Sequence, residues 1–319
     1  MKVTVAGCGR WGSFIAWYLD HIGKEVTLYG RSGSGHMQRF LAERKNEYLE
    51  LPESIRLSTD LACAEEAEVI VISVGAQSLR AFLGELNACN LQGKTIVLCM
   101  KGIEMETGKR LSEIVKETLK KVCPIAVWLG PGHVQEFYRG IPNCMVIDSE
   151  NEETKRWLVE EFSGSLIRFY YGQDLIGNEI GAAAKNVIGI AAGMLDGLKL
   201  HTLKGALMSR GTREVSRLIA ALGGNEISAY GLCHLGDYEA TVFSEHSHNR
   251  KFGELFVQGK DYGELAEGYY TVRAIMLLKE RHHVDMPICE TVYRILYEKA
   301  DMNEEFTRLF SRRLKYEMN

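Results

Sequence analysis

Hydrophobic residues fall into two patterns along this chain, and the change between them lies near its middle. In the first half, short apolar runs alternate with amphipathic helical stretches. The run Ala67–Gly75 is almost wholly apolar, as in a strand whose two faces are both covered. The predicted strands are Lys2–Ala6, Glu25–Tyr29, Ile55–Ser58, Val69–Val74, Thr95–Met100, Ile125–Leu129, Cys144–Ile147 and Leu166–Tyr170.

Helical patterns lie between most of these strands, at Trp11–Ile22, Gln77–Leu86, Thr107–Leu119 and Glu152–Phe162. From about Gln173 the pattern is helical throughout, with helices predicted at Gly181–Leu198, Thr202–Leu222, Leu265–Glu280 and Ile288–Lys299. Alternating strands and helices predict a doubly wound parallel sheet, with the ligand beyond the carboxyl ends of the strands. We therefore predict an α/β protein with an N-terminal Rossmann-type domain, residues 1–173, followed directly by an all-helical substrate and catalytic domain, residues 174–319.

Composition narrows the class of protein. The chain has 319 residues, of which 46% are hydrophobic, and a net charge of −4. This charge gives no reason to expect nucleic acid or an anionic membrane as a partner. We see no signal peptide and no apolar run near the roughly 20 residues that span a bilayer. The eight cysteines form no CxxC pair, so we expect free thiols in a reducing cytoplasm.

The first strand is followed by a glycine-rich turn and then by a helical run. The turn reads GxGxxG over residues 7–12. In such a turn, glycines permit a tight bend and close approach to a pyrophosphate, while the helix N-terminus offers its N–H groups to the anion. This context predicts dinucleotide binding through Gly7, Gly9, Arg10, Trp11 and Gly12.

The end of the second strand bears on which dinucleotide is bound. NAD-selective folds usually place an acidic residue there to hold the ribose 2′-hydroxyl. This chain has Gly30, Arg31 and Ser32 instead, and the last two could hold a 2′-phosphate. We therefore predict NADP or NAD as cofactor with NADP favoured; the alternative is that Arg31 is only a solvated loop residue.

A glycine- and alanine-rich helix, Gly181–Leu198, contains a single cation at Lys185, followed by Asn186. An interior glycine costs a helix about 1 kcal/mol relative to alanine, so we expect close backbone packing to offset this cost. Lys185 is either a surface lysine or a buried amine that moves protons. Lys101 follows a strand at the predicted ligand edge, where it faces the cofactor or is simply a loop lysine.

A second candidate binding segment lies at residues 247–253. Ser247 and Asn249 are residue types that cap helices, and Arg250 is close by. A helix N-terminus beside cations suits a phosphate; the alternative is an ordinary capped surface helix. His246 and His248 lack a third ligand at a suitable spacing, so we predict no metal site.

Taken together, these segments resemble those of a known family, the bacterial-type NAD(P)-dependent glycerol-3-phosphate dehydrogenases. The resemblance covers essentially the whole chain. The matching segments are GCGRWG (7–12), CMKGIE (99–104), LGPG (129–132), AAAKNVIGIAAGMLDGL (182–198), KGALMSRGTREVSRL (204–218), GLCHLGDYEAT (231–241), HNRKFG (248–253) and AEGYYT (266–271).

The resemblance implies reversible hydride transfer between dihydroxyacetone phosphate and sn-glycerol 3-phosphate. It implies that Lys185 is the catalytic proton donor, Asp237 its electrostatic partner and Lys101 a second lysine at the substrate and cofactor. The resemblance further assigns Thr241, Ser247, His248 and Asn249 to the substrate and its phosphate, and Arg250 and Glu267 to the cofactor. The implied partner is a phosphorylated three-carbon ketone or alcohol, with a homodimer as one option for assembly.

Several positions depart from the family pattern, among them Val74-Gly75-Ala76 for Val-Pro-Ser, Gly130-Pro131-Gly132 for Gly-Pro-Ser, and Thr241-Val242-Phe243-Ser244 for Thr-Cys-x-Ser. The family has Arg where this chain has His248, and Gly where it has His234. Imidazole is shorter than guanidinium and cannot form its bidentate fork. Two alternatives to the main hypothesis therefore stay open. One is a paralogous dehydrogenase acting on another small ketone or hydroxy acid, and the other is a non-catalytic cofactor-binding redox sensor.

Overall fold

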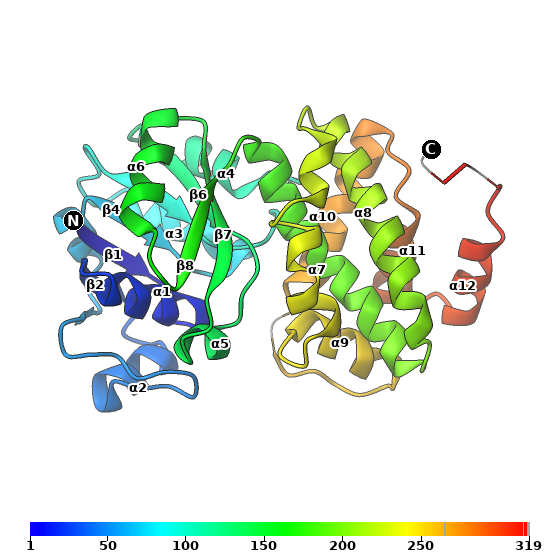
Figure 1. Ribbon diagram of the computed structural model, residues 1–319, viewed down its shortest axis with the longest axis horizontal. Helices are drawn as coiled ribbons and strands as arrows, with labels where there is room; N and C mark the ends of the chain where they lie inside the picture. The colour runs from blue at the N-terminus through cyan, green and yellow to red at the C-terminus, as the bar shows by residue number, and fades with distance from the viewer. Residues whose placement is uncertain (265, 315, 318–319) are drawn as a thin grey trace. The chain divides into compact units, whose positions relative to one another are not determined.

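The computed structural model describes residues 1–264, 266–314 and 316–317. The chain divides into two compact units. The sheet unit comprises Met1–Met100 and Leu111–Leu175, and the helical unit comprises Lys101–Arg110 and Ile176–Asn319 (Figure 1). A short segment from the first half of the sequence thus belongs to the helical unit. The division of the chain into two independent domains, residues 1–173 and 174–319, stays a prediction.

The sheet unit contains one eight-stranded sheet in the order β3-β2-β1-β4-β5-β6-β7-β8. Its strands are β1 Lys2–Ala6, β2 Glu25–Tyr29, β3 Arg56–Ser58, β4 Val69–Ile72, β5 Thr95–Leu98, β6 Ile125–Leu129, β7 Asn143–Ser149 and β8 Ile167–Tyr171. The first six strands are parallel and have the Rossmann order. The predicted fold class is confirmed.

One strand runs against the predicted direction. β7 pairs antiparallel with β6, through Trp128 opposite Ile147, so the sheet is mixed rather than wholly parallel. A parallel return usually needs a crossover helix, but the connection after β6 holds only the five-residue helix α5, Val134–Tyr138. The longer helix α6, Glu152–Phe162, then allows β8 to pair parallel with β7.

The remaining helices of the sheet unit are α1 Arg10–His21, α2 Gly35–Glu43, α3 Leu79–Leu86 and α4 Leu111–Thr118. The helix predicted to begin at Thr107 begins only at Leu111. Gly108 has a φ of +73°, and Ile103 forms an antiparallel bridge with Arg110. Residues 107–110 of the predicted helix therefore form a turn before α4, and they belong to the helical unit.

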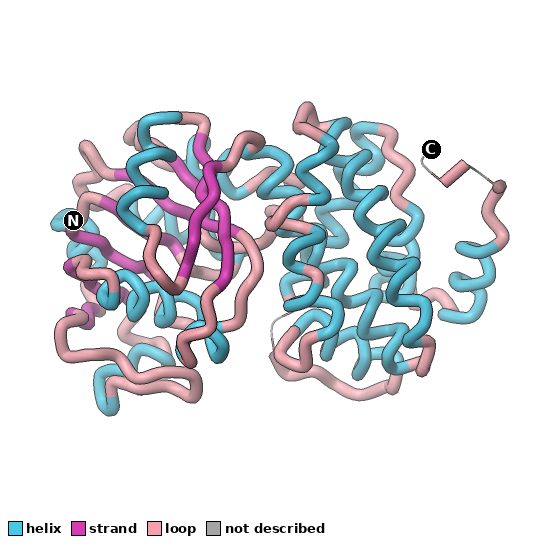
Figure 2. The backbone as a smooth tube through the Cα atoms, viewed as in Figure 1, coloured by secondary structure: helices cyan, strands magenta, loops and turns pink. Residues whose placement is uncertain are grey.

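The helical unit is built around α7, Leu175–Gly197, whose middle is buried over successive turns. Figure 2 shows helices and loops in this unit, and the magenta strands in the sheet unit. The other helices are α8 Lys204–Ala221, α9 His248–Val257, α10 Glu267–His282, α11 Pro287–Tyr297 and α12 Met302–Phe310. α10 was predicted from Leu265, a residue that lies outside the described part of the chain. None of the described helices is long and apolar enough to cross a membrane.

Close packing explains the glycines of α7. A Cβ placed on Gly193 would lie 1.9 Å from the carbonyl oxygen of Arg250 in α9. Reciprocally, a Cβ on Gly253 of α9 would lie 2.1 Å from the carbonyl oxygen of Ile190. The predicted close approach of backbones is confirmed, and it brings the start of α9 against the helix that carries Lys185.

Candidate active site

The sheet unit has a cavity of about 780 Å³ at the carboxyl ends of β1, β2 and β4. Gly7 has a φ of +116°, and a Cβ there would lie 2.1 Å from the carbonyl oxygen of Ser73. A Cβ on Gly9 would meet no atom within 4 Å, so the backbone is open beside the first turn of α1. Gly9 caps α1 without a side-chain hydrogen bond, as suits an anion bound by helix N–H groups. These residues fit a dinucleotide.

The other predicted cofactor residues contribute in different ways. Arg31 and Ser32 line the cavity with Gly7 and Gly9, whereas the side chains of Arg10 and Trp11 do not. The Arg10 guanidinium lies 5.7 Å from the centre of the Tyr48 ring, and the Trp11 ring packs 5.1 Å from that of Phe14. Arg10 and Trp11 therefore offer their backbone at the start of α1.

Glu85 is a cavity residue that sequence reasoning missed. Its carboxylate lies 2.6 Å from an Arg31 guanidinium nitrogen, and both side chains are about half exposed. The residue is on α3, which the sequence predicted only as a helix. Because an acid and a cation now stand together at this rim, the preference between NADP and NAD stays a prediction.

The helical unit brings three of the predicted residues into one ionic cluster. Asp237 Oδ2 lies 2.7 Å from Lys101 Nζ and 2.8 Å from Lys185 Nζ. The Asp237 side chain is 1% exposed, that of Lys185 8% and that of Lys101 20%. Two ammonium groups share one carboxylate, so the cluster has a surplus positive charge when all three are ionised.

Thr241 joins this cluster through a tight turn. The segment Glu239–Phe243 is a π-helix, a feature that often marks functional sites. The Thr241 hydroxyl donates to the Asp237 carbonyl oxygen at 2.7 Å and accepts from Lys185 Nζ at 2.7 Å. Asp237 Oδ1 is buried with no hydrogen-bond partner among the described residues. The Lys185 ammonium is thereby oriented by two oxygens from one segment.

A chain of amides links this cluster to two other predicted residues. The Asn186 amide donates to the Lys101 carbonyl oxygen at 2.8 Å and accepts from the Asn249 amide at 3.1 Å. Asn249 Oδ1 in turn accepts from the Gly268 backbone N–H at 2.8 Å. Glu267 is the first residue of α10, beside Gly268. Asn249 and the start of α10 are therefore fixed relative to Lys101.

The remaining predicted residues sit at the start of α9. Ser247 is confirmed as the helix cap, since its hydroxyl accepts from the Arg250 N–H. His248 Nδ1 lies within hydrogen-bonding distance of the Tyr262 hydroxyl and 2.8 Å from the Glu264 carboxylate. The Arg250 guanidinium donates to Asp196 at 2.8 Å and to the Ser244 carbonyl oxygen at 3.0 Å. Arg250 thus ties α9 to α7, and its role toward the cofactor stays a prediction.

His234 is a second residue whose importance sequence reasoning missed. It is fully buried, its Nδ1 lies 2.8 Å from the Gly181 carbonyl oxygen, and its Nε2 lies 2.7 Å from the Tyr238 hydroxyl. Burial lowers its pKa to about 4, so the ring is neutral: it donates to Gly181 and accepts from Tyr238. The departure from the family glycine was the available signal. This imidazole pins the Asp237 segment to α7.

Comparison with known proteins agrees with both units. The model of the NAD-dependent glycerol-3-phosphate dehydrogenase N-terminus matches residues 2–155, and that of the C-terminus matches residues 174–307. The chain is 37% identical to the glycerol-3-phosphate dehydrogenase [NAD(P)+] of Prosthecochloris aestuarii over the full length of both proteins. It is also 37% identical to the enzyme of the same name from Clostridium botulinum strain Eklund 17B, over 99% of each chain.

Solved structures give the same result. The crystal structure of glycerol-3-phosphate dehydrogenase from Coxiella burnetii has a TM-score of 0.91 and 29% identity, covering 98% of this chain and 99% of that one. The corresponding Plasmodium falciparum structure has a TM-score of 0.85 at 18% identity, covering 99% and 97%. At that identity the second likeness concerns the fold alone. A D-mandelate dehydrogenase has a TM-score of 0.63 at 15% identity and likewise bears only on the fold.

Proposed function

This chain belongs to the NAD-dependent glycerol-3-phosphate dehydrogenase family, and we propose that it interconverts dihydroxyacetone phosphate and sn-glycerol 3-phosphate with NAD(H) or NADP(H). The observation that carries this proposal is the pairing of Lys101 and Lys185 with Asp237 in a chain that matches the family along its whole length. A bound nicotinamide supplies or accepts the hydride. The comparisons give no support to the paralogue or the redox sensor considered above.

Lys185 is the proposed proton donor. When a ketone is reduced, negative charge grows on the carbonyl oxygen, and a fixed cation stabilises it before a proton completes the alcohol. The Lys185 ammonium is held by Asp237 and Thr241, so this cation has a fixed position before a substrate binds. In the reverse direction the amine takes the proton of the hydroxyl group.

Asp237 supplies a negative charge beside this ammonium. Burial alone disfavours the charged form of a lysine, and a nearby carboxylate favours it. With Lys101 on the same carboxylate oxygen, the cluster attracts an anionic substrate without an isolated buried charge. Lys101, which is the more exposed of the two lysines, is the proposed contact to the substrate.

The substrate phosphate is assigned to the start of α9. Ser247 uses its hydroxyl to cap the helix, so the proposed phosphate contacts are His248, Asn249 and the first N–H groups of α9. Gly7, Gly9 and the first turn of α1 are the proposed pyrophosphate site, and Arg31, which lines the same cavity, is the proposed contact to the 2′ position of the ribose. Glu267 is kept as a proposed cofactor contact.

We also propose a cytoplasmic location and a homodimer. The eight cysteines are all free, and six of them are buried, which suits a reducing compartment. The homodimer rests on the family resemblance alone.

The test is NADH and NADPH oxidation by the purified protein with dihydroxyacetone phosphate and a panel of unphosphorylated ketones. We expect dihydroxyacetone phosphate to be the preferred substrate. Lys185→Ala should lower kcat by about 10²–10⁴-fold, the size of a lost proton-transfer group, and leave cofactor affinity near that of the wild type.

Lys116→Ala, which removes an exposed lysine, is the matched control and should be fully active. A Lys185→Ala enzyme within a few-fold of wild-type kcat would remove Lys185 from the mechanism. A preference for an unphosphorylated ketone would contradict the assignment of dihydroxyacetone phosphate as the substrate.

A further inference from the structure

The helical unit has a second cavity, of about 310 Å³, which is open to solvent and lined mainly by α7, α8, α11 and α12. Its walls are mostly aliphatic and aromatic, with Leu195, Leu207, Ile295, Phe306 and Leu309 among them. Small-molecule sites are usually concave, mainly apolar and about 300–1,000 Å³ in size. This cavity therefore has the size and lining of a site for a small apolar group.

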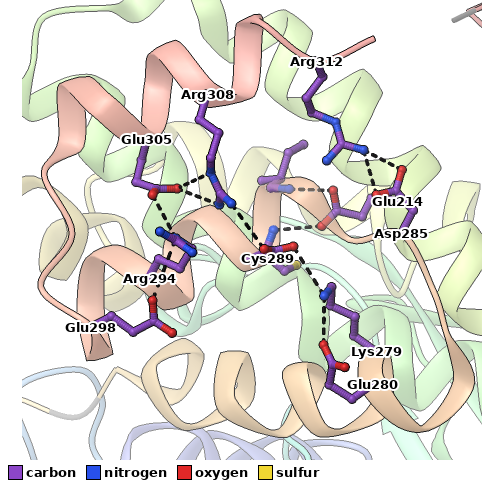
Figure 3. A network of polar contacts seen from close by, with 12 residues as sticks. Glu214, Lys279, Glu280, Asp285, Cys289, Arg294, Glu298, Glu305, Arg308 and Arg312 are labelled. Atoms are coloured by element: carbon purple, nitrogen blue, oxygen red, sulfur yellow. Dashed lines mark hydrogen bonds and ion pairs between the residues drawn. The ribbon is translucent and has the colours of Figure 1, made fainter.

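α12 forms one wall of the cavity and is joined to α11 by an ion pair. Glu305, which is 3% exposed, lies 2.8 Å from Arg294 of α11 and 2.7 Å from Arg308 of its own helix. Figure 3 shows Glu305 between these two arginines. Phe306 and Leu309, on the apolar side of α12, face the cavity. The ion pairs of Glu305 therefore hold α12 in place, while the apolar side of this helix faces the cavity.

Four arginines line the same cavity, and within the described residues only Arg312 forms an ion pair with a carboxylate. Arg312 pairs with the Asp285 carboxylate at 2.7 Å (Figure 3). Arg217 donates to the Asp285 carbonyl oxygen at 2.7 Å, and Arg210 donates to the Glu317 carbonyl oxygen at 2.6 Å, both of which are neutral acceptors. Arg313 is exposed. Guanidinium groups are well suited to binding carboxylates and phosphates.

The second acid in the lining already has partners. Glu214 accepts hydrogen bonds from the backbone N–H groups of Ile288 and Cys289, both at 2.8 Å. Glu214 thereby caps the N-terminus of α11, where the N-cap residue Met286 makes no side-chain hydrogen bond. With Asp285 paired to Arg312, the cavity combines apolar walls with an excess of guanidinium. A ligand complementary to it has an apolar chain and an anionic head.

We propose that this cavity binds a linear alkyl carboxylate, with its chain among the apolar walls and its head group on Arg210 and Arg313. If a methylene fills about the volume of a water molecule, roughly 30 Å³, the cavity has room for about ten such groups. The site is separate from Lys185, although α7 contributes Ala191, Met194 and Leu195 to it. A bound chain therefore contacts the helix that carries the proposed proton donor.

Isothermal titration of the full-length protein with decanoate tests this proposal, without substrate or cofactor. We expect one molecule per chain and a Kd below 1 mM. The double variant Arg210→Gln/Arg313→Gln should bind at least tenfold more weakly. Arg39→Gln/Arg139→Gln, which removes two exposed arginines of the sheet unit, is the matched control and should bind like the wild type. Decylamine, with the same chain and opposite charge, should bind at least tenfold more weakly than decanoate.

A cavity-filling variant, Ala206→Trp, provides a second test, since Ala206 lines the cavity from α8. It should abolish decanoate binding and leave NADH binding unchanged. Absence of decanoate binding to the wild type, or equal loss in the two double variants, would overturn the proposal. So would an Ala206→Trp protein that changes from a dimer to a monomer in sedimentation, because the face would then be a contact between copies of the chain. Each readout is independent of dehydrogenase activity.

Discussion

His248 is one of the residues at which this chain departs from the family pattern noted in the sequence analysis. The family has an arginine here, and this chain has an imidazole held by Tyr262 and Glu264. If the substrate is a phosphate ester, His248→Arg should lower KM for dihydroxyacetone phosphate by about tenfold and leave kcat unchanged. A hydrogen bond to a charged group contributes roughly 1.5–3 kcal/mol, and 1.4 kcal/mol is tenfold in affinity. Steady-state NADH oxidation measures both constants.

His246→Arg is the control for the His248 variant. It adds the same charge at an exposed position two residues away and should leave KM near the wild-type value. An unchanged KM in His248→Arg would mean that the imidazole, with its neighbours, already replaces the guanidinium, or that the phosphate is bound elsewhere.

Two buried groups give the stability of the protein opposite dependences on pH. Burial raises the pKa of Glu214 to about 7 from 4.5, so the folded protein keeps a proton that the unfolded chain releases. Its contribution to the free energy of unfolding therefore falls as pH rises from 4.5 to 7. The His234 pKa is lowered to about 4 from 6.5, so its contribution rises with pH over 4 to 6.5.

Glu214→Gln removes the ionisable group whose contribution to the free energy of unfolding falls as pH rises. Relative to the wild type, the free energy of unfolding of this variant should increase by about 3 kcal/mol between pH 4.5 and 7, since one pKa unit is about 1.4 kcal/mol. Urea denaturation at pH 5 and pH 7 measures most of this change. Glu53→Gln, at a carboxylate that is 92% exposed, should show no such change. A difference between Glu214→Gln and wild type that is the same at both pH values would contradict the assignment.

At the residue scale, the sequence predicted what depends on residue type within a motif. It singled out Lys185, Asp237 and Thr241, and the structure brings them together. It could not predict that Arg250 would pair with Asp196. A long arginine side chain at the start of a helix can extend in more than one direction, and the sequence does not show which. Glu85 and His234 were missed for a related reason: their importance depends on partners far away in the sequence.

At the scale of elements, the contact of α7 with α9 leaves no room for side chains. Gly193→Ala would place its methyl group 1.9 Å from the Arg250 carbonyl oxygen and 2.8 Å from the Glu254 nitrogen. Because both are helix backbone, α9 must move, and overpacking typically costs about 1–3 kcal/mol. Chemical denaturation should show at least this loss, together with reduced activity from a displaced Asn249.

Gly205→Ala is the matched control for this substitution. Gly205 is in α8, and a Cβ there meets no atom within 4 Å. The change should stabilise the protein by about 0.5–1 kcal/mol, the helix preference for alanine over glycine. Equal effects of the two substitutions would mean that α7 and α9 are not in close contact in solution.

The bounds of a strand or helix were predictable where the hydrophobic pattern ended at the same residues as the element itself. β1, β2, β6 and α6 have the predicted bounds. The start of α4 was wrong because the apolar period extends backwards through Gly108, whose positive φ ends it. The direction of β7 was wrong because an apolar run predicts a strand and not its orientation. α12 was missed since its nine residues alone give too short a periodic pattern.

At the scale of the whole molecule, the Lys101–Arg110 segment is separated from its neighbours in sequence. It leaves the sheet unit after β5 and belongs to the helical unit, where Ile103 is fully buried in the core. Ile103→Ala should destabilise by about 2–5 kcal/mol. Hydrogen exchange should then become faster in residues 176–319. Ile147→Ala, at an equally buried residue of the other core, should instead act on the sheet unit. Faster exchange in the sheet unit for both variants would contradict this division.

The same segment has a consequence for synthesis on the ribosome. Thr107 accepts a hydrogen bond from Arg281, 174 residues later, and Lys101 pairs with Asp237, 136 residues later. At roughly 5–20 residues per second, the segment waits about 7–35 seconds for these partners to be made. The sheet strands on both sides of it can pair during that interval, but the apolar side chain of Ile103 has no core to enter. The ionic cluster at Asp237 therefore cannot assemble until long after the strands on both sides of Lys101 have been made.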